Sequence, residues 1–396
     1  MSIPRDSRLT ADSVAARWTH LGPRVNAART QLLDSTAARD MELYQGHVEN
    51  FIGTLKVPVG IAGPLRVQGH YARGDFHVPL ATTEAALVAS YSRGARLISE
   101  AGGCRVSILD EAVCRSPVFA FHNLEEAVGF AAWLRTQQPQ LQQVASSTSR
   151  FARLIAIRPV IEGNHVYVDF EFVTGDAAGQ NMVTFATEAI VAHVVRHSAV
   201  APLRYFIESN CSGDKKASAQ ALRGVRGRRV SAEIELAESL VEQRLHTSVQ
   251  WMCEYWRMGM IGCALSATVG AQGHYANALA ALYLACGQDP ACVAESAVGL
   301  TRFEALEHGG LYAAVTLPNA LVGTVGGGTS LPTQQACLSI LGLAGAGHAR
   351  ALAEICAALC LAGELSLVGA ICADQFARAH RELARQTRRA VPGGAA

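Results

Sequence analysis

The chain divides at residues 208–216, Glu208-Ser209-Asn210-Cys211-Ser212-Gly213-Asp214-Lys215-Lys216. This small, polar stretch follows an apolar run, residues 201–207, and precedes a helix-prone segment, residues 217–222. Such a loop usually lies at the surface, where its backbone is solvated. A lysine beside an aspartate is commonly just a solvated pair, so the loop alone specifies no function.

Length and composition indicate a large intracellular protein of several domains. A chain of 396 residues is too long for one simple core, so we expect two domains or more. Half of the residues are hydrophobic and 17% are charged, which suits a large core and a subunit interface. The net charge is +1, and the one arginine cluster, residues 223–229, contains no aromatic residues. We therefore expect no nucleic-acid partner.

The cysteines and the apolar segments favour a cytoplasmic protein. Eleven cysteines show no pairing pattern and no C-x-x-C spacing, which indicates a reducing compartment and gives no reason to expect a metal site. The N-terminus lacks the apolar region of a signal peptide. Residues 258–288 carry no Asp, Glu, Lys or Arg, but a polar, glycine-rich centre interrupts them. We expect buried core there and no membrane span.

Residues 116–207 have an alternating pattern of their own. Strands are predicted at 117–121, 151–160, 166–173 and 203–207, and helices at 124–134 and 181–196. This β-α-β-β-α-β order predicts a ferredoxin-like unit. Residues 174–181 form a glycine-containing turn that opens the second helix, a place where anions or nucleotides can bind, although the G-x-G-x-x-G spacing is absent.

We therefore predict an α+β fold with three parts. Residues 1–50 would form an N-terminal helical segment, with helices within 11–43. Residues 51–115 and 208–396 would form a mostly helical large domain, and residues 116–207 an inserted ferredoxin-like domain. In the large domain we expect a helix at 85–98 capped by Thr82 or Thr83, and a last helix at 364–386. Glu84 would lie in the first turn, where it could simply complement the helix dipole.

Eight motifs in order resemble 3-hydroxy-3-methylglutaryl-CoA (HMG-CoA) reductases, and in particular the catalytic part of the class I enzymes. They are Glu49-Asn50-Phe51-Ile52-Gly53, residues 58–65, Ala81-Thr82-Thr83-Glu84, Gly175-Asp176-Ala177, Asp214-Lys215-Lys216, Ala285-Cys286-Gly287-Gln288-Asp289, residues 323–329 and Gly363-Glu364-Leu365-Ser366-Leu367. They cover most of the chain, from about residue 44 to 385, and so many ordered motifs are specific.

The resemblance implies a reduction of an acyl-CoA thioester to a primary alcohol with two NADPH. Lys215 would stabilise the oxyanion, and His380 would protonate the departing CoA thiolate. Glu84 would protonate the aldehyde oxygen, and Asp289 would lie beside Lys215 and Glu84 and tune both. A carboxylate near a second carboxylate has a raised pKa, which keeps a proton available near neutral pH.

The same resemblance implies binding roles for a wider set of residues. The acyl group would contact Arg115, Asp214, Lys216 and Asn277. The CoA segment would contain Ser90, Arg93 and Arg96, although a helix face with this pattern could also simply be solvated. The NADPH side would comprise Ser149, Arg150, Asp176, Gly179, Asn181 and Arg385. A homodimer or larger homo-oligomer is implied, with active sites between subunits.

Some positions depart from the family pattern. Glu208 stands where the family has a serine in the acyl-binding loop, and Met258, next to Arg257, stands where it has a substrate-binding lysine. The stretch 270–274 is one residue shorter than in class I relatives, and Ala178 and Gln180 replace methionines. The first two departures bear on the substrate's free carboxylate, because losing a cation and gaining an anion disfavours a second negative charge nearby. The alternatives to an HMG-CoA reductase are a reductase of another acyl-CoA thioester and a catalytically silent CoA-binding protein.

Overall fold

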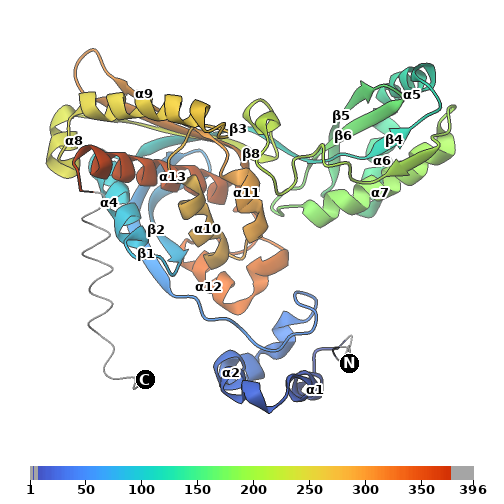
Figure 1. Ribbon diagram of the computed structural model, residues 1–396, viewed down its shortest axis with the longest axis horizontal. Coiled ribbons are helices and arrows are strands. Elements are labelled where there is room, and N and C mark those ends of the chain that lie inside the picture. Colours follow the sequence, from blue (N-terminus) through green and yellow to red (C-terminus); the bar gives the residue numbers. More distant parts are fainter. Residues whose placement is uncertain (1–2, 4–7, 376–396) are drawn as a thin grey trace.

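The computed structural model describes residue 3 and residues 8–375. Figure 1 shows a large part, a smaller part joined to it through extended segments, and a group of short N-terminal helices. The α-helices are α1 Ala11–Leu21, α2 Asn26–Leu32, α3 Ser35–Arg39, α4 Leu87–Glu100, α5 Leu124–Thr136, α6 Gln138–Thr148, α7 Gln180–His197, α8 Glu238–Leu245, α9 Val249–Leu265, α10 Tyr275–Ala285, α11 Val293–Ser296, α12 Pro332–Ile340 and α13 Ala349–Cys372. The strands are β1 Val59–Gly69, β2 Arg73–Ala81, β3 Cys104–Arg115, β4 Val118–Ala120, β5 Arg153–Glu162, β6 His165–Val173, β7 Arg204–Phe206, β8 Gly227–Leu236, β9 Leu300–Ala305 and β10 Leu311–Ala320.

The large part is built on a sheet, in addition to its helices. Its strands follow the order β2-β1-β3-β8-β10-β9, and only the β1–β3 pairing is parallel. The prediction of a mostly helical chain after residue 222 therefore missed the strands β8, β9 and β10. In β8, Val230, Ala232, Ile234 and Leu236 are buried at every second position, which is the period of a strand. This period is hard to recognise in the sequence, because the small residues of this stretch are also compatible with a helix.

Helix α13 lies at the centre of the large part. Nearly all of its residues from Ala349 to Ala370 are buried, as expected for a helix that is apolar all round. Among residues 3 and 8–375, it alone is long and apolar enough to cross a membrane, yet 89% of its most apolar window is buried inside the protein. It packs on α4, α10, β8 and β10.

The start of this helix differs from the prediction. It begins at Ala349 and not at Glu364, and it ends at Cys372. Gly363 lies inside the helix, and a side chain there would clash with the ring of Tyr91 on α4. This glycine thus allows close helix packing and does not mark a boundary. His380 and Arg385 lie outside the described residues.

The smaller part has the predicted elements and one more helix. Its strands follow the order β7-β4-β6-β5, and all neighbours are antiparallel. Helix α6 was not predicted, because its glutamine- and serine-rich sequence has little apolar period; only Leu141 and Ala145 are buried. The end of β3, Val113 to Arg115, pairs with β6, so one strand runs from the large sheet into the small one.

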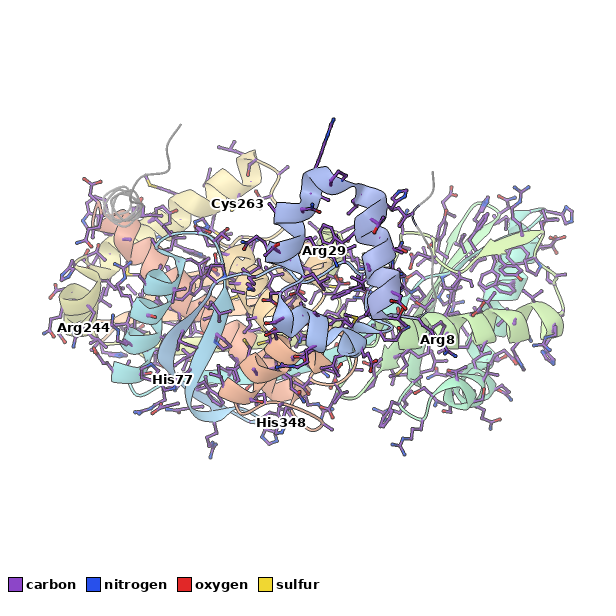
Figure 2. All side chains as sticks on the ribbon, turned by 90° about the horizontal axis from the view of Figure 1, so that it is seen from below. Arg8, Arg29, His77, Arg244, Cys263 and His348 are labelled. Atoms are coloured by element: carbon purple, nitrogen blue, oxygen red, sulfur yellow. The ribbon has the colours of Figure 1, made fainter. Side chains whose placement is uncertain are left out.

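The N-terminal helices pack mainly on one another. Leu9, Val14, Trp18, Met41 and Phe51 form their own small core, as the helical prediction for 11–43 requires. Helices α1 and α2 lie beneath the large part in Figure 1 and in front of it in Figure 2, which views the molecule from below.

Candidate active site

Lys215 and Asp289 form an ion pair, as the motifs predict. The Lys215 Nζ lies 2.8 Å from the Asp289 Oδ2, and both side chains are about two-fifths exposed. The hydrogen bond to Asp289 raises the pKa of Lys215. Partial burial favours the neutral form of Asp289, but hydrogen bonds from Lys215 and from the Ala291 N–H outweigh it and lower the pKa of Asp289. The expected rise in the pKa of a carboxyl group at this site is thus not found at Asp289, because its neighbour is a cation.

Two backbone arrangements hold this pair in place. Lys215 adopts a left-handed conformation (φ 57°), and its N–H donates to the Glu295 Oε1 at 3.2 Å. Asp289 follows the end of α10, where the Gln288 side chain bonds both the N–H (2.8 Å) and the carbonyl (2.9 Å) of Gly323. The first bond ties the Lys215 loop to α11, just after Asp289, and the Gln288 bonds tie the Asp289 loop to Gly323.

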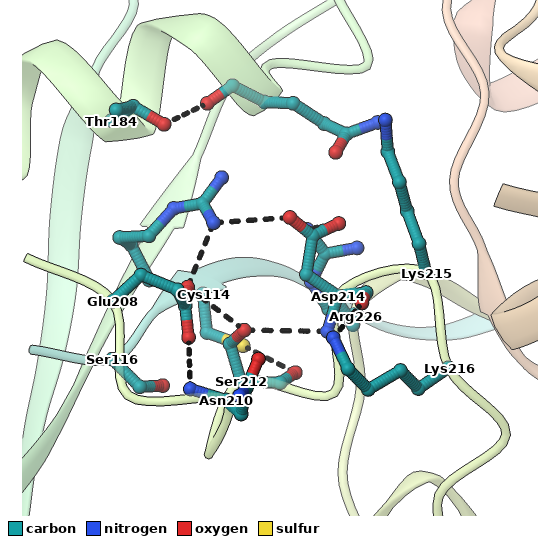
Figure 3. Close-up of polar contacts among 12 residues, drawn as sticks. Cys114, Ser116, Thr184, Glu208, Asn210, Ser212, Asp214, Lys215, Lys216 and Arg226 are labelled. Atoms are coloured by element: carbon teal, nitrogen blue, oxygen red, sulfur yellow. Dashed lines mark hydrogen bonds and ion pairs between the residues drawn. The ribbon is translucent and has the colours of Figure 1, made fainter. Parts of the chain in front are cut away.

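Acidic side chains of the loop 208–216 form ion pairs with arginines that pack against the loop (Figure 3). The Arg115 Nη1 lies 2.7 Å from the Glu208 Oε2 and 3.0 Å from the Asp214 Oδ2. The other Asp214 oxygen lies 3.0 Å from the Arg226 Nη2, and Arg226 also pairs with Glu295. Glu295 is fully buried, and burial raises its pKa although Arg226 opposes the rise. Sequence analysis missed Arg226 and Glu295, because their partners are far apart in the chain.

Lys215 and Asp289 border a cavity of about 510 Å³, and several glycines line it. Gly179 and Asn181 at the start of α7 line it, together with Gly287, Gly323 and residues 326–328. A Cβ at Gly323 would lie 2.5 Å from the Ala178 nitrogen, so backbone meets backbone there. Gln180 reaches across, and its Nε2 lies 3.5 Å from the Asp289 Oδ2 and 2.9 Å from the Cys292 Sγ.

The other residues predicted to bind NADPH, Asp176, Arg150 and Ser149, make contacts within this chain. The Asp176 carboxylate accepts the N–H groups of Gly347 (2.8 Å) and Ala349 (3.2 Å), and so it holds the start of α13. The Arg150 guanidinium lies over the exposed ring of Phe151, 4.7 Å from its centre. The Ser149 hydroxyl accepts from the Phe151 N–H.

Glu84 lies at a second cavity, of about 300 Å³. Among the described residues, no hydrogen bond or ion pair joins Glu84 to Lys215 or Asp289. Glu84 precedes α4, which begins at Leu87 after Ala86 in a left-handed conformation (φ 71°). The prediction of a threonine cap was therefore wrong: the Thr82 hydroxyl accepts the Glu84 N–H ahead of the helix, and Glu84 lies before the first helical turn.

The predicted CoA residues line this second cavity. They are Ser90, Arg93 and Arg96 on α4, and Asn277 on α10 lies with them. Two donors of the Arg93 guanidinium are used by Ser366 on α13: its Nε donates to the Ser366 hydroxyl at 3.1 Å, and a second nitrogen donates to the Ser366 carbonyl. The Lys216 Nζ instead donates to the Asp214 carbonyl at 3.0 Å. One chain thus carries two separate groups of predicted site residues, one at the cavity beside Lys215 and one at the cavity beside Glu84.

Comparisons with known proteins identify the family of this chain. Residues 13–385 match the family described as hydroxymethylglutaryl-coenzyme A reductase. The 3-hydroxy-3-methylglutaryl-coenzyme A reductase of Methanocaldococcus jannaschii is 42% identical over 86% of this chain and 85% of its own. That of Pyrococcus abyssi is 41% identical over 87% and 86%. The fold resembles a class II enzyme of Streptococcus pneumoniae, solved bound to NADPH (TM-score 0.67, 20% identity, 88% of this chain and 85% of that one). The chain belongs to the hydroxymethylglutaryl-coenzyme A reductase family.

Proposed function

We propose that this protein reduces HMG-CoA to mevalonate and CoA with two NADPH. The observation that carries the proposal is the Lys215–Asp289 pair at the edge of a glycine-lined cavity, in a chain about 41% identical to curated reductases over most of its length. In the first reduction, R–CO–SCoA, NADPH and H⁺ give the aldehyde, CoA thiol and NADP⁺. In the second, the aldehyde, NADPH and H⁺ give the primary alcohol and NADP⁺.

Lys215 stabilises the oxygen of the reacting carbonyl in both reductions. Its ammonium stays charged to higher pH because the hydrogen bond to Asp289 raises its pKa, and its side chain is open enough to meet a ligand. A cation fixed where negative charge develops lowers the barrier without rearrangement at the moment of reaction. Asp289 keeps this ammonium oriented and charged.

Two further groups handle protons in this proposal. Glu84 is exposed at its cavity and would protonate the oxygen of the aldehyde. His380, which is outside the described residues, would protonate the leaving thiolate. General acids of these types are effective near neutral pH when their pKa lies close to it.

The residues around the larger cavity suit NADPH, which supplies the hydride when bound. The glycines that line this cavity expose backbone, which leaves room for a flat ring. Helix α7, which has 18 residues, begins at the cavity edge beside Asn181, where its first N–H groups can bind an anion. Arg150 on its exposed site, with Arg385, would pair with the 2′-phosphate. We infer that residues 116–207 form a ferredoxin-like nucleotide-binding domain, and the strand order β7-β4-β6-β5 supports this.

The second cavity suits the CoA part of the substrate. Arg96 and Arg93 bring positive charge to its wall, and Ser90 and Asn277 add polar groups. Guanidinium groups bind phosphate oxygens strongly. The eleven free cysteines support a reducing, cytoplasmic location for the enzyme.

We further propose that the active form is a homodimer, or a multiple of it, with the site shared between chains. Lys215 and Glu84 belong to different cavities in one chain, so a second chain would have to bring them together. Helix α9 presents an exposed apolar face with Trp251, Met258, Ile261 and Leu265, the last of which is 85% exposed. Large exposed apolar faces usually belong to interfaces.

The direct test is an assay of NADPH oxidation with HMG-CoA, with released CoA thiol and mevalonate measured in parallel. We expect two NADPH consumed for each CoA released, and a higher kcat/KM with NADPH than with NADH. A silent CoA-binding protein would bind CoA and oxidise no NADPH. Reduction of other acyl-CoAs with no reduction of HMG-CoA would favour a specialised reductase instead.

A further inference from the structure

Arg115 shares one guanidinium nitrogen, Nη1, between two of this chain's own carboxylates. Its side chain is 9% exposed, and its Nη1 donates to Glu208 at 2.7 Å and to Asp214 at 3.0 Å. Glu208 is the outer member of this group, with its side chain 32% exposed. An incoming anion would therefore meet Glu208 before it could reach the guanidinium.

Glu208 is held in this position by the loop that carries Lys215. Its Oε1 accepts the Asn210 N–H at 2.7 Å, and its Oε2 accepts the Ser212 hydroxyl at 3.1 Å. Asn210 adopts a left-handed conformation (φ 65°) that turns its N–H back to this carboxylate. The loop is thus folded around Glu208 in its ion-paired position (Figure 3).

The charges of the site cancel within one chain. Four carboxylates and four cations make up this group. The carboxylates are Glu208, Asp214, Asp289 and Glu295, and the cations are Arg115, Lys215, Arg226 and Lys216, the last bonded to the Asp214 carbonyl. The sum is zero, so the cluster holds no surplus positive charge for a substrate carboxylate. With a neutral residue at 208, the same cluster would carry one surplus positive charge next to Arg115.

Helix α9 supplies no replacement cation. Met258 is exposed at the position where the family resemblance places a lysine, and the adjacent Arg257 pairs with Glu254 at 2.8 Å. Of the two departures from the family pattern, Glu208 is the one that contacts Arg115, and among the described residues no ion pair joins α9 to this group.

We propose that Glu208 is a specificity-determining residue for the acyl group. By holding Arg115, it allows acyl-CoA thioesters whose acyl group lacks a distal carboxylate to be reduced about as well as HMG-CoA. This inference rests on the proposed reductase function and defines its substrate class: branched 3-hydroxyacyl thioesters, with or without the distal carboxylate.

The test compares HMG-CoA with 3-hydroxy-3-methylbutyryl-CoA, which has the same skeleton without the distal carboxylate. For the wild-type enzyme we expect kcat/KM values within about tenfold of each other, whereas a site built to bind the missing group discriminates by about 10⁴ or more. Glu208→Gln keeps the shape and removes the charge, so that Arg115 becomes available. It should raise kcat/KM for HMG-CoA by about 10- to 100-fold, mainly through KM, because a charge-assisted hydrogen bond contributes that much. The value for the neutral substrate should stay within about threefold.

Glu208→Ser is a second variant with a smaller side chain, and it should act in the same direction. The matched control is Glu242→Gln on the exposed face of α8, which should leave both substrates unchanged. If the wild type prefers HMG-CoA by 10³ or more and neither Glu208 variant changes the ratio, the inference is overturned while the proposed function stands. If neither substrate is reduced by any of these enzymes, the proposed function fails, and the inference fails with it.

Discussion

At the scale of single residues, the account depends on the state of Lys215. The ion pair with Asp289 keeps the ammonium charged and aimed, and the Glu295 oxygen holds its backbone. The sequence predicted this pairing because both residues lie in specific motifs. It did not predict the ion pairs that support them, since Arg115, Asp214, Arg226 and Glu295 lie in separate segments that only folding brings together.

Lys215→Ala should fold normally and lose most of its turnover. The side chain is partly exposed and paired only at its tip, so its removal leaves no buried charge behind. Removing one donor to a developing oxyanion costs about 10²–10³ in kcat, and a charged donor costs more. Steady-state kinetics and a thermal melt of the same preparation would measure both. Near-normal turnover would refute the assigned role.

Asp289→Asn should move the alkaline limb of the pH profile to lower pH. In the native protein, the hydrogen bond to Asp289 raises the pKa of Lys215, so the lysine stays protonated to higher pH. Without the carboxylate the pKa of Lys215 falls, and the active ammonium is lost earlier as pH rises. The check is kcat/KM against pH from 6 to 11. An unchanged alkaline limb would show that Lys215 does not set it.

At the scale of elements, α13 organises the large part through two buried carboxylates. Glu354 accepts the N–H groups of His70 (3.1 Å), Tyr71 (3.0 Å) and Ala72 (2.6 Å) at the β1–β2 turn. Glu364 accepts the N–H groups of Gly273 and His274 and the Thr301 hydroxyl. A last helix was predicted from Glu364, but its continuity with the residues before it was not, because Gly363 reads as a boundary until its packing on Tyr91 is seen.

Glu354→Ala should destabilise the protein by about 3 kcal/mol or more. Glu354 is fully buried, and its loss leaves three backbone donors without their acceptor. Hydrogen bonds to charged groups contribute about 1.5–3 kcal/mol each, and unsatisfied buried donors add a further cost. Denaturant unfolding would measure the change, with Glu242→Ala on α8 as the exposed control. A loss no larger than that of the control would contradict the assigned role of Glu354.

At the scale of the whole molecule, sequence and structure agree on the parts and differ on their composition. The alternating order of residues 116–207 was predicted because strand and helix periods are clear there. The sheet strands β8, β9 and β10 were not, because small residues such as Ala232 and Ala313 carry little signal of their own. In the proposed assembly a second chain sets the relation between the Lys215 and Glu84 cavities, and the sequence of one chain indicates this only through resemblance.

The central claim is that one active site unites the Lys215 group of one chain with the Glu84 group of another. The measurement is the activity of an isolated heterodimer of a Lys215→Ala chain and a Glu84→Gln chain, each with its own tag. In a shared site, one of the two sites has both residues intact, so we predict about half of the wild-type activity from two inactive parents. The reciprocal control pairs a wild-type chain with a chain that carries both substitutions, and it should be inactive. An inactive first heterodimer together with a half-active control would contradict the account, because it would place both residues in the site of a single chain.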